Sequence, residues 1–204
     1  MLSLGVRRPE SLPDHLRESD RISVHKYESV DREAGDRWVA EAITRHGAID
    51  ALINNAGISP QIHLEDGTDE ALDEVFEINV KAPFRLLRAA MPHLKKSGQG
   101  RVINVSSLSG KRVMGLNAGY QMSKFAVVAL THAVRRAGWD SGVRATALCP
   151  GLVDTEMSKD YPGVTPEEKT DPEDLARIVH LLLELPNTAS VAELLVNCRY
   201  EHMV

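Results

Sequence analysis

The fold is decided by residues 101–124, which read RVINVSSLSGKRVMGLNAGYQMSK. The apolar run at its start has the length of a strand, and the stretch that follows leads to Tyr120 and Lys124, four residues apart. On a helix this spacing places both side chains on one face. A lysine ammonium beside a phenol favours the phenolate, so we expect the pKa of Tyr120 to fall from about 10 towards working pH. Tyr120 is therefore a candidate general acid/base, and Ser107, thirteen residues earlier, is a candidate to hold the substrate oxygen.

Outward from this stretch, apolar runs of strand length alternate with helix-length patterns. The expected strands are Leu2–Val6, Ile22–Tyr27, Ala51–Asn54, Arg101–Val105, Val143–Cys149 and Glu193–Asn197. The expected helices are Glu10–Arg17, Glu33–His46, Thr68–Lys95, Gly119–Gly138 and Pro172–Leu185. Alternation of this kind predicts an α/β fold with a parallel sheet covered by helices. Pro83 lies inside the longest helix, which we expect to kink or split there.

Three further motifs accompany Ser107 and the Tyr-x-x-x-Lys pair. Asn54-Asn55-Ala56-Gly57 follows an apolar run, Asn79 lies in a helical pattern, and Pro150-Gly151-Leu152-Val153-Asp154-Thr155 follows another apolar run. In order and spacing these motifs resemble the short-chain dehydrogenase/reductase family over nearly the whole chain. The resemblance implies a Rossmann-like, doubly wound parallel sheet in three layers, with residues 1–204 as one domain.

The resemblance also implies catalytic roles. Tyr120 would be the general acid/base, and Lys124 would lower its pKa and bind the nicotinamide ribose. Ser107 would orient the substrate carbonyl or hydroxyl, although Ser106 or Ser109 could take this place. Asn79 would hold a water that links Lys124 to bulk solvent.

The other motif residues would bind the cofactor. By resemblance, Asn54, Ala56 and Gly57 would form a turn against its adenosine half, and the nicotinamide side would be lined by Pro150, Gly151, Val153 and Thr155. Each motif also has a structural reading, because Asn and Gly tolerate positive φ and Pro-Gly is a common loop signal. Residues 157–170 correspond to the substrate lid of the family, or to a plain surface loop.

The family's opening strand and its Gly-x-x-x-Gly-x-Gly turn have no counterpart in the sequence. That turn brings backbone N–H groups to the cofactor diphosphate. The chain therefore reads as an N-terminally truncated member, beginning at the family's second strand. Three explanations stay open: the true start lies upstream, the strand Leu2–Val6 slides into the central position, or a partner molecule completes the sheet.

By resemblance, NAD-specific members carry an acidic residue for the ribose 2′-hydroxyl at the end of the strand that corresponds to Leu2–Val6. Here that position is Val6, and Arg7 and Arg8 follow it. Guanidinium groups suit a 2′-phosphate, which favours NADP over NAD. Alternatively, both arginines are solvated surface charges. Glu28 lies where the family often has an aspartate that touches adenine.

The composition of the chain argues against several classes of binding partner. The net charge is −5 and the pI about 5.9, which argues against nucleic acid or an anionic membrane. No apolar run approaches the ~20 residues of a membrane span. The two cysteines and the lack of a signal-peptide pattern favour the cytoplasm, and the eight histidines show no metal-ligand spacing.

The sequence thus predicts an NADP-dependent oxidoreductase that interconverts a carbonyl and an alcohol of a small molecule. The rival interpretation is a truncated, inactive relative that serves as an interaction or assembly partner. By resemblance, the chain would form a homodimer or homotetramer through its two long helices.

Overall fold

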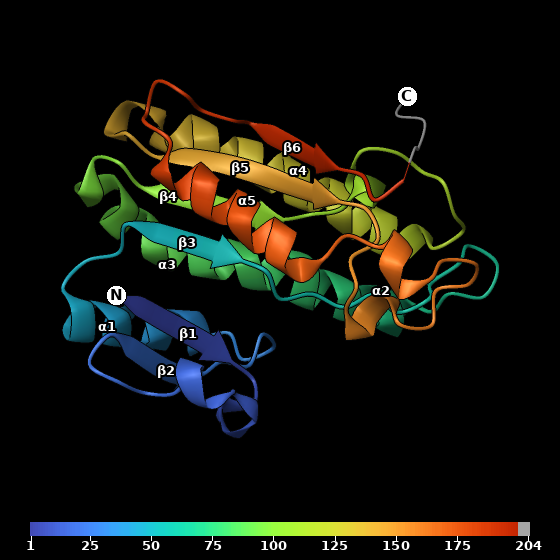
Figure 1. Cartoon of the computed structure of the whole chain (residues 1–204), viewed down its shortest axis with the longest axis horizontal. Helices are drawn as coiled ribbons and strands as arrows, with labels where there is room; N and C mark the ends of the chain where they lie inside the picture. The colour runs from blue at the N-terminus through green and yellow to red at the C-terminus, as the bar shows by residue number, and fades with distance from the viewer. Residues whose placement is uncertain (200–204) are drawn as a thin grey trace.

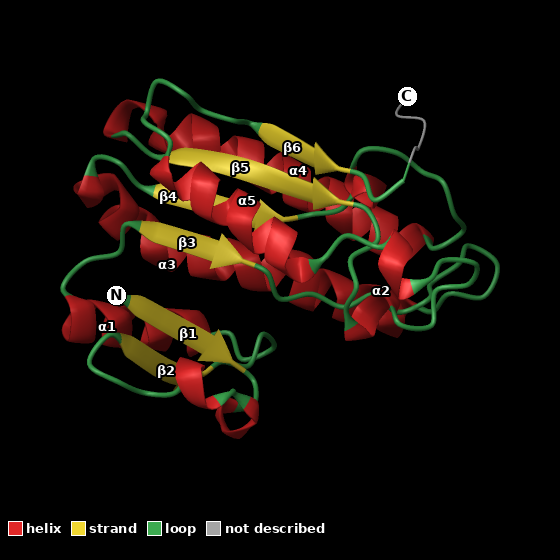
Figure 2. Cartoon of the chain, viewed as in Figure 1, coloured by secondary structure: helices red, strands yellow, loops and turns green. Residues whose placement is uncertain are grey.

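The computed structural model describes residues 1–199. Its strands all run parallel and fall into two sheets, one of order β2-β1 and one of order β3-β4-β5-β6 (Figures 1 and 2). The strands are β1 (Leu2–Val6), β2 (Ile22–Lys26), β3 (Ala51–Asn54), β4 (Arg101–Val105), β5 (Arg144–Pro150) and β6 (Glu193–Val196). Each begins within one residue of its expected start.

Helices cover the larger sheet on both faces, which gives the predicted three layers (Figure 1). One face carries α3 (Ala82–Ser97) and α4 (Ala118–Gly138), with α1 (Ala34–His46) continuing this layer behind β1 and β2. The other face carries α5 (Pro172–Glu184). Among residues 1–199, no helix is both long and apolar enough to cross a membrane.

Two apolar clusters hold these layers together. On the α3–α4 side, Leu94, Val102 and Val143 are fully buried. On the α5 side, Ile103 and Leu148 pack against Leu182. Since full burial of one such side chain contributes about 1.5–3 kcal/mol, these clusters fix β4 and β5 at the centre of the larger sheet.

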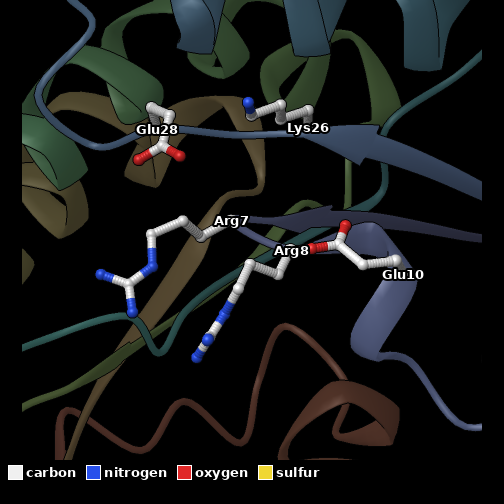
Figure 3. A pocket seen from close by; sticks show the side chains of 5 residues that line it. All are labelled: Arg7, Arg8, Glu10, Lys26 and Glu28. Atoms are coloured by element: carbon white, nitrogen blue, oxygen red, sulfur yellow. The ribbon is translucent and has the colours of Figure 1, made fainter.

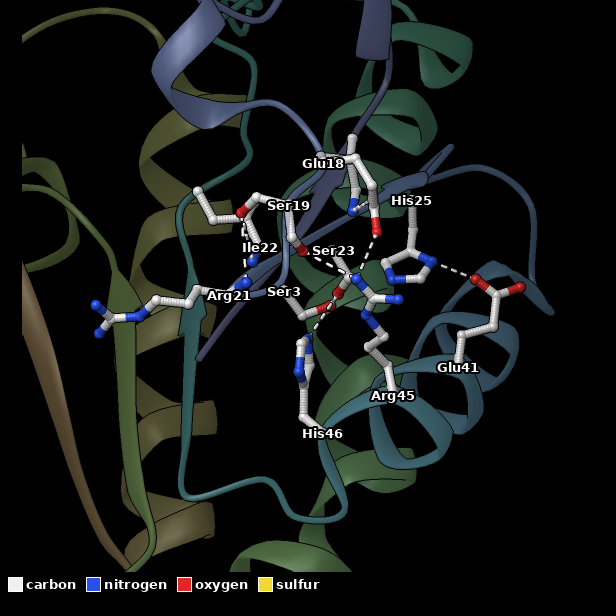
Figure 4. Close-up of polar contacts among 11 residues, drawn as sticks. Ser3, Glu18, Ser19, Arg21, Ile22, Ser23, His25, Glu41, Arg45 and His46 are labelled. Carbon is white, nitrogen blue, oxygen red and sulfur yellow. Dashed lines mark hydrogen bonds and ion pairs between the residues drawn. The ribbon is translucent and has the colours of Figure 1, made fainter.

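Polar contacts fasten α1 to one face of the β1–β2 sheet (Figure 4). Ser23 is buried, and its hydroxyl hydrogen-bonds Ser3 Oγ at 3.0 Å and His46 Nε2 at 2.9 Å. The Trp38 indole N–H donates to Ser3 Oγ at 2.8 Å, and its ring lies against Gly5 so closely that a Cβ there would meet it at 2.6 Å. Gly5 therefore permits close packing of α1 on β1.

The expected helix Glu10–Arg17 is wrong. The segment forms two short 3₁₀ turns, Pro9–Ser11 and Asp14–Leu16. Pro13 between them is extended, with φ −64° and ψ 156°. Proline lacks an N–H donor and disfavours helical backbone in the preceding residue, so it separates the two turns.

The long expected helix Thr68–Lys95 is divided, but not by Pro83 itself. It consists of α2 (Asp69–Phe76), a π-helical turn η3 (Glu77–Lys81) and α3. Pro83 lies in the first turn of α3, where proline is tolerated. The irregular turn instead contains Asn79, and π turns of this kind often occur at functional sites.

The strand β1 does not slide into the central position. Within residues 1–199 it pairs with β2, and β3 pairs with β4, so the two sheets are not joined by a strand ladder. That alternative is therefore excluded for this structure.

Candidate active site

The carboxyl ends of parallel strands meet at one edge of a sheet, and the predicted site residues follow these ends. Asn54–Gly57 follows β3, Ser107 follows β4, and Pro150–Thr155 follows β5. Tyr120 and Lys124 come from the start of α4, which returns to this edge. The topology thus gathers predicted site residues from the ends of β3, β4 and β5 and from the start of α4.

Asn117 sets the position of Tyr120. It is the N-cap of α4, and its Oδ1 accepts from the Tyr120 N–H at 3.3 Å and the Ile62 N–H at 3.1 Å. Its Nδ2 donates to Pro60 O at 2.8 Å. One side chain therefore caps α4 and ties it to the loop after β3.

The Tyr120 phenol lies beside Ser107. Burial raises the pKa of Tyr120 above its usual value, and the Ser107 hydroxyl partly opposes this effect. Ser107 caps a short 3₁₀ turn, accepting from Ser109 N at 3.1 Å. Ser106 is buried and donates to Lys124 O at 2.8 Å, so it holds the backbone of α4 rather than facing the phenol.

Lys124 is buried, with 6% of its surface exposed. Its Nζ donates to Val105 O at 3.0 Å and lies 5.6 Å from the centre of the Tyr120 ring. Burial lowers the pKa of Lys124 to about 8. The Tyr120 pKa is therefore raised and not lowered as expected, because removing the phenolate from water outweighs the opposing effect of the Ser107 hydroxyl.

Asn79 is 2% exposed and joins three segments of the site. Its Oδ1 accepts from Ile58 N at 2.8 Å, and its Nδ2 donates to Ile58 O at 2.9 Å and to Ser123 Oγ at 3.1 Å. Gly57 lies against it: a Cβ at Gly57 would be 3.2 Å from Asn79 Oδ1 and 3.6 Å from Lys124 Nζ. Asn79, Gly57 and Lys124 are therefore brought together, while the water-holding role of Asn79 stays a prediction.

A buried amide relay supports the turn after β3. Asn54 Nδ2 donates to Asn104 Oδ1 at 2.8 Å, and Asn104 Nδ2 donates to Thr131 Oγ1 at 2.9 Å. Asn104 and Thr131 are fully buried. The relay links β3, β4 and α4, so Asn54 acts in the scaffold of the site as well as lying at the predicted cofactor turn.

Backbone contacts to β6 and to Thr170 hold the segment that follows β5. Gly151 N donates to Val196 O at 2.8 Å, and Val153 forms a bridge with Thr170. Lys169, the neighbour of Thr170 in the chain, is buried and donates to Ser158 O at 2.7 Å. Thr155 is exposed at the start of residues 155–169, which form a loop with short 3₁₀ turns.

Arg7 and Arg8 lie in a separate cavity of about 330 Å³ at the carboxyl ends of β1 and β2 (Figure 3). Both side chains extend in the same direction, and Lys26, Glu10 and Glu28 complete the lining. Three cations and two carboxylates leave a formal charge of +1. Among residues 1–199, no cluster of three or more His, Cys, Asp or Glu side chains could hold a metal ion.

Sequence reasoning missed the supporting residues Asn117, Ser123, Asn104 and Thr131. Asn117 carried a readable signal, since asparagine directly before a helical pattern is a preferred N-cap. The other three carried none, because a buried hydrogen bond between distant segments leaves no local pattern.

Comparisons with known proteins agree with this arrangement. Residues 2–163 match the short chain dehydrogenase family. The chain is 37% identical over 202 residues to an agropine synthesis reductase of Rhizobium rhizogenes, covering 98% of this chain and 47% of that protein. It therefore spans about half the length of this curated relative.

Two solved structures are similar to the fold. An alcohol dehydrogenase from Thermococcus sibiricus, complexed with 5-hydroxy-NADP, has a TM-score of 0.80 and 28% identity over 89% of this chain and 76% of its own. A short-chain dehydrogenase from Streptomyces avermitilis has a TM-score of 0.83 and 25% identity over 95% of this chain and 77% of its own. The chain belongs to the short-chain dehydrogenase family.

Proposed function

We propose that the chain is an NADP-dependent oxidoreductase that interconverts a carbonyl and an alcohol, with Tyr120 as general acid/base. The observation that carries the proposal is the convergence of Tyr120, Ser107 and Lys124 at the carboxyl edge of the sheet. Relatives named as reductases or dehydrogenases support it, and none supports the inactive alternative.

The protonation states suit proton transfer. The raised pKa keeps Tyr120 a phenol near neutral pH, so in the reducing direction it can give its proton to a substrate oxygen. The Ser107 hydroxyl, beside the phenol, would hydrogen-bond the same oxygen. Lys124 is still mostly charged at pH 7, so its ammonium would stabilise the phenolate that is left.

The residues present fit part of a nicotinamide cofactor. When bound, the cofactor supplies or accepts the hydride. Lys124 Nζ has one acceptor, Val105 O, and an ammonium carries three donors, so the remaining donors suit ribose hydroxyls. Asn54, Ala56 and Gly57 would line its adenosine half, and Pro150, Gly151, Val153 and Thr155 its nicotinamide side. The sequence lacks the glycine-rich turn for the diphosphate.

The choice of NADP rests on the cavity at the end of β1. Arg7 and Arg8 are exposed and parallel, so both guanidinium groups can meet one phosphate, while Lys26 adds a third cation. The similar alcohol dehydrogenase from Thermococcus sibiricus is complexed with 5-hydroxy-NADP.

The remaining assignments are proposals of the same kind. The substrate is a small carbonyl or alcohol compound, and the chain acts in the cytoplasm, where its two free cysteines stay reduced. A homodimer or homotetramer would cover Phe84, Met122 and Phe125, which are 51%, 49% and 42% exposed on α3 and α4.

The test is titration of the purified chain with NADPH, followed by fluorescence, with NADH as the comparison. We expect saturable binding that favours NADPH. Arg8→Ala should weaken NADPH binding about tenfold or more, because a charge-assisted hydrogen bond contributes about 1.5–3 kcal/mol. Its effect on NADH should be small, and Arg136→Ala, an exposed arginine on α4, should change neither affinity.

Turnover tests the catalytic assignment. With a carbonyl substrate found by screening, Tyr120→Phe should reduce kcat by at least about 100-fold while NADPH binding and the circular dichroism spectrum stay unchanged. Unchanged turnover in this variant would refute the proposed mechanism.

A further inference from the structure

Lys169 is a buried cation that the proposed mechanism does not use. It ends the loop of residues 155–169, and its side chain is only 1% exposed. Lysine is almost never fully buried unless it is paired. Its Nζ donates to Ser158 O at 2.7 Å and lies 3.9 Å from Asp154 Oδ1. The described residues thus offer the buried ammonium one close carbonyl and one more distant carboxylate, which is a costly environment for a charge.

Backbone hydrogen bonds join the two ends of this loop. Asp154 N donates to Thr170 O at 2.9 Å, and Thr170 N donates to Leu152 O at 3.0 Å. Val153 and Thr170 form a parallel bridge between these two bonds. Since Lys169 directly precedes Thr170, its ammonium is anchored at the point where the loop returns to the segment after β5.

Ser158 connects the Lys169 ammonium to the backbone of Val153. Its carbonyl accepts from Lys169 Nζ, and its hydroxyl donates to Val153 O. Ser158 N also donates to Thr155 O at 3.0 Å, which closes the short 3₁₀ turn Glu156–Ser158. A continuous series of hydrogen bonds therefore runs from the buried charge to the Val153 carbonyl.

Val153 is the residue where this series reaches the proposed cofactor site, because the proposed function assigns it to the nicotinamide side. The segment between β5 and α5, orange in Figure 1, lies beyond the carboxyl end of β5. Ser107 follows β4, which pairs with β5. A shift of the Val153 backbone would therefore change the distance from the nicotinamide to Tyr120, while the separate cavity of Arg7 and Arg8 would stay as it is.

We propose that Lys169 is a positioning residue for the nicotinamide end of the cofactor and acts through Ser158 on the Val153 backbone. The ammonium holds the Ser158 carbonyl, this contact places the Ser158 hydroxyl, and the hydroxyl fixes the Val153 carbonyl. Hydride transfer needs the reacting atoms about 3–3.5 Å apart, and a displacement of about 1 Å can cost about 100-fold in rate. The inference rests on the proposed function, which places Val153 at the cofactor.

The first measurement is residue-resolved amide hydrogen exchange of the free 204-residue chain, which needs no cofactor. Lys169→Met keeps most of the length of the side chain and removes the ammonium. The amides of Asp154, Ser158 and Thr170 should then exchange about tenfold faster or more, because their hydrogen bonds close the segment that Lys169 holds. The amide of Ile103, in the buried strand β4, should exchange as in the parent.

Kinetics then separate positioning from folding. With a carbonyl substrate found by screening, Lys169→Met should lower kcat about tenfold or more, whereas the Kd for NADPH should change less than about threefold. The reason is that the contacts proposed for the adenosine half do not include the segment that Lys169 holds. A residue with a structural role alone would lower the stability of the fold without this division between kcat and Kd.

Lys159→Met is the matched control, because it makes the same substitution at an exposed position of the same loop. The Lys159 side chain is 64% exposed, and its Nζ lies 3.4 Å from Glu156 Oε1. An exposed ion pair of this kind contributes little. This variant should therefore change neither the exchange rates nor kcat.

Ser158→Ala tests the middle of the series and does not disturb the buried charge. It removes the hydroxyl that donates to Val153 O, so it should reproduce most of the loss of kcat even if Lys169→Met fails to fold. The double variant should lose no more than the more severe single variant, because both substitutions break the same series of contacts.

Three results would overturn the proposal. Unchanged exchange of the Asp154 and Thr170 amides in a folded Lys169→Met protein would mean that the ammonium does not hold this segment. Additive losses of kcat in the double variant would mean that Lys169 does not act through Ser158. A Kd for NADPH that rises as much as kcat falls would place the effect on cofactor binding as a whole.

Failure of the proposed function gives a different result. A parent chain that binds no NADPH would refute the oxidoreductase assignment and, with it, a role for Lys169 at the cofactor. Faster exchange of the Asp154 and Thr170 amides in Lys169→Met would still show that Lys169 holds the Val153 segment.

Discussion

The buried Lys124 should lower the stability of the free protein. An ammonium that has left water and found a single carbonyl acceptor, Val105 O, is poorly solvated. The pKa of Lys124 falls from 10.5 to about 8 for this reason. Lys124→Met keeps most of the volume of the side chain and removes the charge, so it should stabilise the fold.

The size of this effect follows from the pKa shift. The shift from 10.5 to about 8 corresponds to about 3 kcal/mol at pH 7, since each unit is about 1.4 kcal/mol. Loss of the hydrogen bond to Val105 O offsets about 1 kcal/mol. We therefore expect Lys124→Met to unfold with a free energy about 2 kcal/mol higher at pH 7.

The sign of the pH dependence provides a sharper check. The folded pKa of Lys124 lies below the unfolded one, so the unfolded state binds more protons between pH 8 and 10.5, and the penalty fades as pH rises. The advantage of Lys124→Met should shrink by about 2 kcal/mol between pH 7 and 9.5. Cys149, whose pKa burial raises to about 11, acts in the opposite direction, but it is present in both proteins and cancels to first order in the difference.

Urea unfolding of both proteins at pH 7 and 9.5 measures this difference. Lys96→Met, at an exposed lysine near the end of α3, serves as the control and should change stability by less than about 1 kcal/mol. Two results would refute the claim that the buried Lys124 ammonium lowers the free energy of unfolding. One is a Lys124→Met protein that is less stable than the parent at pH 7, and the other is a stability difference that does not change with pH.

Other substitutions test the scaffold of the site. Thr131→Val leaves the buried Asn104 amide without its acceptor and should lower the free energy of unfolding by about 1–3 kcal/mol, measured in urea, whereas no change would mean that the relay is not formed. Gly119→Ala places a Cβ 2.7 Å from Ile62 Cδ1 and should cost about 1–3 kcal/mol in the same assay; an unchanged midpoint would contradict this packing. Asp171→Ala removes the side chain that accepts from Glu173 N at the start of α5 and should cost about 1 kcal/mol, with Asp171→Asn retaining most of the stability.

The strands and most helices could be predicted because their signals are local. Apolar runs such as Arg101–Val105 are buried beneath the helices that cover both faces of the sheet, and Asp171 caps α5 as its position before Pro172 indicates. The helix predicted over Glu10–Arg17 did not form. This short polar segment contains two prolines, Pro9 and Pro13, and therefore lacks the continuous series of N–H donors that an α-helix needs.

The sequence predicted which residues form the candidate site better than it predicted their pKa values. Spacing placed Tyr120 and Lys124 on one helix face, as the structure shows. It carried no information about desolvation, which depends on what packs around the phenol and raises its pKa. The π turn at Asn79 was likewise hidden, because a bond to Ile58, 21 residues away, stabilises it.

The two sheets differ in how far helices cover their faces. Around β4 and β5 both faces are covered, and Asn79, Asn104 and Asn117 bind the catalytic segments to one another. The β1–β2 sheet has one covered face and reaches the larger sheet through the packing of α1 on α3, where Trp38 and Val39 join the main apolar cluster. The geometry of Ser107, Tyr120 and Lys124 therefore depends on the larger sheet, since their contacts lie in β4, β5, α4 and the turn after β4.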